Sequence, residues 1–126
     1  MFSFSKRKTL SISEKEFYLD ILHEIRQNLN DAGLLVHANI VGNLILLLEQ
    51  NKIPQFIKLL NGVDMWGGSG AVWEVYIENK VLASKFERSI IKLVDLMNNT
   101  NMSSCPVNSI RKLFLDNLKN DYHNTV

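Results

Sequence analysis

The sequence of 126 residues predicts an all-α fold, a compact bundle of five or six helices with a Gly-rich loop before the fourth helix. Two observations favour helices. In several segments apolar residues recur every three to four positions, which is the period of one buried helix face. Residues that begin or end helices, such as Ser-x-x-Glu boxes, proline and glycine, flank these segments. The length suits one domain.

Two long helices are expected in the first half of the chain. The first is expected to begin at Ser13, because Ser13 and Glu16 match a capping box, in which the two side chains accept backbone N–H groups of the first turn. Its apolar stripe consists of Phe17, Ile21, Leu22, Ile25 and Leu29. The second helix is expected over residues 34–49. It is apolar almost all round, which predicts a central helix surrounded by its neighbours.

Three further helices show clear boundaries. A short helix is expected from Pro54, since proline suits the first turn. Ser84 and Glu87 match a second capping box. The stripe of the helix that follows consists of Phe86, Ile90, Leu93, Val94 and Met97. The last helix is expected to open at Pro106 and to fray over residues 120–126. Its apolar face consists of Val107, Ile110, Phe114 and Leu118.

The least ordinary stretch contains Gly67, Gly68 and Gly70. Three glycines so close together predict a tight loop, because glycine disfavours a helix interior. Backbone N–H groups of such a loop, placed before a helix, can bind a phosphate. No Lys-Ser/Thr pair follows the glycines, however, and the nearby Asp64 and Glu74 would repel an anion. A structural loop, beside which two tryptophans pack on the core, is therefore favoured over a phosphate site.

The residues after the glycines allow two interpretations. Residues 71–77 are rich in Val, Trp, Tyr and Ile, which favour strands. A lone strand would lack a partner in an otherwise helical chain, so a fourth helix from about Ser69 is preferred. On that helix Glu74 and Glu78, four residues apart, would share one face. This pair is interpreted as a solvated acidic face rather than as an acid–base pair.

Composition narrows the class of protein and its location. The formal net charge is +1, which gives no overall attraction to nucleic acid or to an anionic membrane. Cys105 is the only cysteine, so an intramolecular disulfide is impossible and a reducing compartment is expected. Residues 1–11 carry a basic triplet without the apolar run of a secretory signal. They are predicted to form a flexible arm before a single domain over 12–126, located in the cytoplasm and not inserted in a membrane.

No constellation of catalytic or metal-binding residues is recognisable. His23, His37 and His123 are scattered over three segments without a partner at metal-ligand spacing. Cys105 has no recognisable base or acid to activate it. The sequence therefore predicts a protein that is not an enzyme, with no catalytic residue, no metal and no cofactor.

The segment 65–74, Met-Trp-Gly-Gly-Ser-Gly-Ala-Val-Trp-Glu, resembles a motif of small bacterial helical domains. That motif is an aromatic residue followed by Gly-Gly-x-Gly-Ser-x-x-Asp and apolar residues, after helices rich in leucine. The present chain departs from it at Ala71, where the motif has Ser, and at Glu74, where it has Asp. Proteins of this appearance often lie beside polymorphic toxin genes and resemble immunity proteins.

The resemblance implies a protein that binds one cognate toxin and neutralises it by occlusion. The partner-binding residues would be Asp64, Trp66, Glu74 and Glu78, with Trp66 as a buried anchor and the carboxylates steering a basic surface. Two other functions stay open. One is a small-molecule or phosphate-binding domain, enzymatic or not, that uses the Gly67–Gly70 loop. The other is a self-associating module in which the apolar second helix forms the interface. No nucleic-acid partner is expected, and the sequence leaves the oligomeric state open.

Overall fold

The computed structural model describes residues 9–103 and 107–124, the last four of them by their backbone only. The helices in these residues are α1 (Ile12–Asp31), α2 (Leu35–Glu49), α3 (Ile53–Leu60), α4 (Val63–Trp66), α5 (Lys80–Asn99) and α6 (Val107–Asn124), with a 3-10 turn η1 (Val72–Glu74). This part of the chain contains no strand, so the predicted all-α fold is confirmed. Most of the predicted basic arm, together with Cys105 and Pro106, lies outside the described residues.

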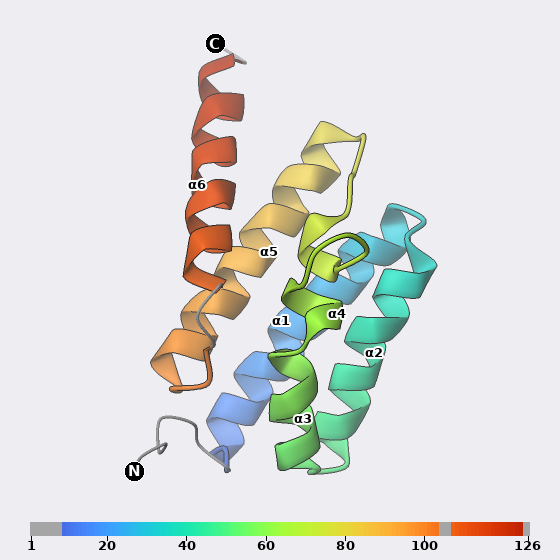
Figure 1. Ribbon diagram of the computed structural model, residues 1–126, viewed down its shortest axis with the longest axis vertical. Coiled ribbons are helices and arrows are strands. Elements are labelled where there is room, and N and C mark those ends of the chain that lie inside the picture. Colours follow the sequence, from blue (N-terminus) through green and yellow to red (C-terminus); the bar gives the residue numbers. More distant parts are fainter. Residues whose placement is uncertain (1–8, 104–106, 125–126) are drawn as a thin grey trace.

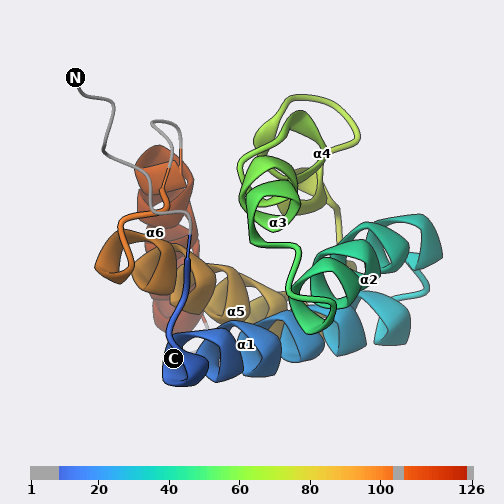
Figure 2. The same ribbon diagram turned by 90° about the horizontal axis from the view of Figure 1, so that it is seen from below.

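Helix α1 is the centre of the arrangement (Figure 1). It packs against α2 on one side and α5 on the other, while α3 packs against α2 and α6 against α5. Figure 2 shows α3 over one face of the layer that α1, α2 and α5 form, whereas α6 lies beside α5, at the edge of the layer far from α2. Buried side chains from all six helices join in one hydrophobic core.

The start and the buried face of α1 differ from the prediction. The capping box consists of Ser11 and Glu14: the Ser11 hydroxyl accepts from Glu14 N at 3.1 Å, and the Glu14 carboxylate accepts from Ser11 N at 3.0 Å. The chain contains two overlapping Ser-x-x-Glu patterns, of which the helix uses the first; Leu10, directly before it, packs against the core. Phe17 is 57% exposed, and Tyr18 occupies the core in its place.

Helix α5 also begins earlier than predicted. Its N-cap is Asn79, whose side-chain oxygen accepts from Leu82 N at 2.9 Å, and Ser84 lies inside the helix. The predicted stripe is nevertheless buried as a whole, namely Phe86, Ile90, Leu93, Val94 and Met97. At the end of the chain α6 continues as a helix to Asn124, beyond the point at which fraying was expected, and Leu118 in its predicted apolar face is only partly buried.

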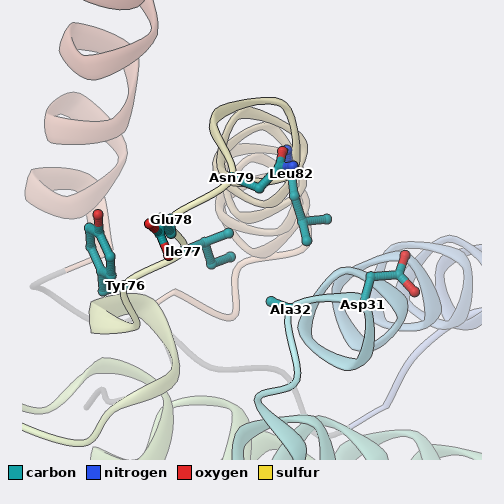
Figure 3. A pocket seen from close by; sticks show the side chains of 7 residues that line it. All are labelled: Asp31, Ala32, Tyr76, Ile77, Glu78, Asn79 and Leu82. Atoms are coloured by element: carbon teal, nitrogen blue, oxygen red, sulfur yellow. The ribbon is translucent and has the colours of Figure 1, made fainter.

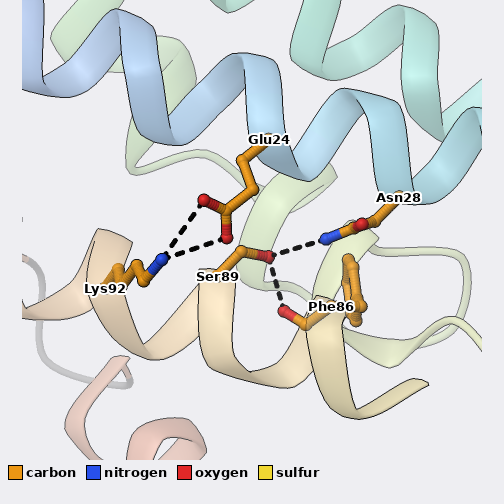
Figure 4. A network of polar contacts seen from close by, with 5 residues as sticks. All are labelled: Glu24, Asn28, Phe86, Ser89 and Lys92. Carbon is orange, nitrogen blue, oxygen red and sulfur yellow. Dashed lines mark hydrogen bonds and ion pairs between the residues drawn. The ribbon is translucent and has the colours of Figure 1, made fainter. Parts of the chain in front are cut away.

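Polar contacts fix α1 against α5 (Figure 4). Buried Asn28 donates from its amide to the Ser89 hydroxyl at 3.4 Å, and that hydroxyl donates to the Phe86 carbonyl at 2.7 Å. At the surface Lys92 forms an ion pair with Glu24 at 3.2 Å. Buried polar groups are costly unless they are hydrogen-bonded, so this chain of contacts favours one register between the two helices.

Helix α2 is not the central helix that its composition predicts. One face is buried and consists of Ala38, Val41, Leu44, Ile45 and Leu48. The opposite face is open, with Leu35 61% exposed, Val36 71% and Leu46 50%. The reason is position, because α2 lies at the edge of the layer and contacts chiefly α1 and α3. None of the described helices combines the length and apolar character that crossing a bilayer requires.

Candidate functional site

The connection from α4 to α5 is the part of the chain that least resembles a simple bundle. The predicted helix from Ser69 does not form: only η1 is helical, and residues 75–78 are extended up to the cap at Asn79. Val75 and Ile77 are half-buried, whereas Tyr76 and Glu78 are exposed. This alternation with a period of two is that of a strand. The segment therefore forms neither the preferred helix nor a paired strand within the described residues, although its side chains alternate as those of a strand do.

Two tryptophans attach this connection to the core. Trp66 is only 6% exposed, and its indole N–H donates to the Leu60 carbonyl at the end of α3 over 2.6 Å. Trp73 donates to the Gly67 carbonyl at 2.8 Å, and its ring lies 6.4 Å from that of Phe114 in α6. Trp66 therefore exposes almost no surface to a partner. Packing and one hydrogen bond account for its presence, and its predicted role as a binding anchor is untested.

The glycine loop is built from internal contacts. Gly67 N donates to Val63 O at 2.8 Å, and Ala71 N donates to Gly68 O at 3.0 Å. Gly70 has φ +90°, a left-handed conformation that favours glycine, and its carbonyl accepts from His37 Nε2 at 3.1 Å. No long helix follows directly, so the loop lacks the helix N-terminus that the phosphate hypothesis required. These contacts favour the structural interpretation of Gly67, Gly68 and Gly70.

The predicted acidic residues are exposed but do not form the predicted pair. Glu74 ends η1 and Glu78 lies in the extended segment, so they do not share a helix face. Asp64 is exposed on α4. The fold instead brings Asp31, at the end of α1, close to the extended segment. Sequence reasoning missed this neighbour, because the two segments are far apart in the chain and only the packing of α1 on α5 joins them.

A pocket of about 610 Å³ separates the end of α1 from the extended segment (Figure 3). It is lined by Asp31, Ala32, Tyr76, Ile77, Glu78, Asn79 and Leu82. Ile77 points toward the end of α1, whereas Tyr76 lies on the opposite side of the segment. A smaller pocket of about 180 Å³ flanks the segment on that other side, between α5 and α6. The segment is thus a ridge with a hollow on each side.

The backbone of residues 76–78 has no partner in the part of the chain that the structure describes. The N–H and C=O groups of Tyr76, Ile77 and Glu78 make no hydrogen bond with the described residues. Tyr76 is 81% exposed. Backbone polar groups without an internal partner are solvated or bind another molecule. We call residues 76–78 the exposed ridge.

Among the described residues, no three His, Cys, Asp or Glu side chains lie together in a way that could hold a metal ion. His23 is exposed and His37 bonds to the glycine loop, while Cys105 and the His123 side chain lie outside what the structure describes. No protein family, curated protein or solved structure matches the chain significantly. The resemblance to immunity proteins therefore stays a prediction from the motif alone.

The glycine loop offers a matched pair of substitutions. We expect Gly67→Ala to destabilise the fold by about 1–3 kcal/mol, because its Cβ would lie 2.6 Å from the Val63 carbonyl oxygen. We expect Gly68→Ala to be neutral or to stabilise by up to about 1 kcal/mol, since no atom lies within 4 Å of its Cβ. Urea unfolding of both variants measures the difference. Equal midpoints would contradict the close approach of Gly67 to α4.

Proposed function

We propose that the chain is an immunity-type protein that binds a cognate bacterial toxin and blocks it by occlusion. The observation that supports this proposal best is the exposed ridge, an extended segment whose backbone groups make no hydrogen bond with the described residues and whose aromatic side chain, Tyr76, is 81% exposed. The glycine motif that resembles immunity proteins leads directly into this ridge. The two lines of support therefore fall on one surface.

The ridge suits a protein partner in three ways. Its free N–H and C=O groups can pair with an exposed strand of the partner, a recurring mode of recognition for extended segments. Tyr76 supplies a large contact area at low cost in side-chain entropy. The carboxylates of Glu74, Glu78 and Asp31 place negative charge around it, which favours a basic surface on the toxin. In this proposal Tyr76 takes the predicted anchoring role of Trp66. The exposed Asp64 lines a different pocket, together with residues of α3.

The test uses the toxin domain that the hypothesis requires, the variable C-terminal domain encoded by a large gene beside this one. That domain is expressed in a bacterial host with and without the present chain, and growth is measured. Affinity is then measured with the two purified proteins. We expect the chain to restore growth, and Tyr76→Ala and Glu78→Lys each to weaken binding, the former by roughly 30-fold, equivalent to about 2 kcal/mol.

Two matched controls separate the ridge from the general surface. Phe17→Ala removes an exposed aromatic residue from α1, and Glu16→Lys reverses an exposed charge there. Both should bind as the unchanged protein does. Absence of both growth rescue and binding would refute the proposed function. Binding that survives both ridge substitutions in folded protein would refute the ridge as its surface.

A further inference from the structure

The outer face of α2 carries a regular stripe that the described residues leave exposed. Val36, Asn39, Asn43 and Leu46 are all exposed, with spacings of three, four and three residues. This is the spacing of the contact seam in a coiled coil. Between Leu35 and Leu48 the helix contains no Asp, Glu, Lys or Arg. A helix face with exposed Val and Leu and no charged side chain is more typical of an interface than of a solvated surface.

We propose that this stripe binds the same stripe of a second copy of the chain, with the two α2 helices antiparallel. The positions are self-complementary. A two-fold axis that lies between the two helices, perpendicular to both at the level of residue 41, places Val36 opposite Leu46 of the second copy. It also places Asn39 opposite Asn43 of the second copy. Each apolar side chain then meets an apolar one. Each amide meets an amide, which can both donate and accept.

The asparagines give this pairing a register. A polar residue within a helical seam costs stability unless it is paired, and this requirement is the best-attested way in which helices select one alignment. A shift by one turn would place Asn39 or Asn43 against an apolar side chain. The symmetric alignment satisfies all four amides together.

The charges at the helix ends favour the antiparallel direction. The N-terminus of α2 has no side-chain cap and no acidic residue in its first turn, so its free N–H groups form a positive end. Exposed Glu49 lies at the opposite, negative end and borders the same face. The antiparallel pair brings Glu49 of each copy beside the uncapped N-terminus of the other. A parallel pair would instead place the two Glu49 carboxylates together, which is repulsive.

Helix α1 forms the border of this face. The guanidinium of Arg26 lies across Gly42, with Cζ 3.3 Å from the place of a Cβ at that residue. Arg26 lines the same pocket of about 500 Å³ as Asn43 and Glu49. Because Gly42 has no side chain, Arg26 of α1 can lie flat against α2 at the edge of this face. From there its guanidinium can donate to amide or carboxylate oxygens at the rim of the interface.

The size of the face predicts how tight the dimer is. A helix of 15 residues is about 22 Å long. A stable dimer commonly buries about 800 Å² per partner, more than one such helix pair provides. We therefore expect a dimer that forms reversibly with rising protein concentration rather than a permanent one.

Disulfide trapping tests the partner, the direction and the register together. Val36→Cys and Leu46→Cys are made separately in a Cys105→Ser background, with tags of different mass, and are oxidised alone and mixed. We expect the covalent dimer in the mixture and not from either variant alone. Residues ten positions apart on a helix are about 15 Å apart, whereas a disulfide needs Cα atoms within about 7 Å. Phe17→Cys, exposed on α1, is the control and should not cross-link.

The other outcomes overturn the proposal. A covalent dimer of Val36→Cys alone would show a parallel pair. If no mixture gave a covalent dimer, the stripe would not bind a second copy.

Sedimentation of the unchanged chain gives an independent measurement, in which the mean mass should rise toward the dimer with concentration. Leu46→Asp should abolish that rise while leaving the midpoint of thermal unfolding within a few degrees. A chain that stays monomeric throughout would refute the second copy as the occupant, whatever the result for the exposed ridge.

Discussion

Replacing Phe56 with alanine is expected to destabilise the fold by about 3–5 kcal/mol, the usual cost of truncating a buried phenylalanine. Phe56 lies in α3 and is fully buried. Its ring meets the edge of Tyr18 in α1, with the centroids 5.4 Å apart and the planes at 81°. Tyr18 in turn hydrogen-bonds through its hydroxyl to Thr100 Oγ1 at 2.7 Å. The cavity would therefore open where α1, α3 and the end of α5 meet.

The matched control is Phe17→Ala. Phe17 precedes Tyr18 on α1 but is 57% exposed, so its loss should change the free energy of unfolding by about 0.5 kcal/mol or less. Urea unfolding monitored by circular dichroism compares both variants with the unchanged chain. Similar losses for the two phenylalanines would mean that Phe17, as the sequence suggested, belongs to the core.

Phe17 also illustrates how far the sequence determines the fold. The period of apolar residues located the long helices, and in α5 it predicted the buried stripe correctly. It could not choose between Phe17 and Tyr18, because each continues an apolar row along α1. The choice depends on which side of α1 meets α3 and α5, and that is a tertiary property. Overlapping Ser-x-x-Glu patterns created the same ambiguity at the helix start, where Ser11 rather than Ser13 is the cap.

The candidate sites depended even more on tertiary contacts. The period of two in residues 75–78 was visible in the sequence, but a strand without a partner is unfavourable, so a helix was preferred. The ridge stays extended because side chains on both sides of it hold the connection: Trp73 bonds to the glycine loop and Asn79 caps α5. Composition likewise showed that α2 is apolar all round, yet it could not reveal that neighbours cover only one face.

Replacing Trp66 with alanine is the second substitution for which a large effect is expected, about 3–5 kcal/mol of stability. The indole is 6% exposed and belongs to the core, and its N–H satisfies the Leu60 carbonyl at the end of α3 over 2.6 Å. The substitution removes both the ring and the donor. Trp66→Phe keeps most of the apolar volume and isolates the hydrogen bond, so we expect it to cost about 1–3 kcal/mol.

The reason to measure Trp66 beside Tyr76 is that the two aromatic residues separate folding from binding. Tyr76→Ala should leave the free energy of unfolding within about 0.5 kcal/mol, since Tyr76 is 81% exposed, and should act on toxin affinity. Trp66→Ala should lower the midpoint of urea unfolding. Its toxin affinity, calculated from the concentration of folded protein alone, should equal that of the unchanged chain. If Trp66→Ala weakened binding but kept full stability, the anchoring role would return to Trp66. Such a result would mean that the side chain acts on affinity directly rather than through the fold.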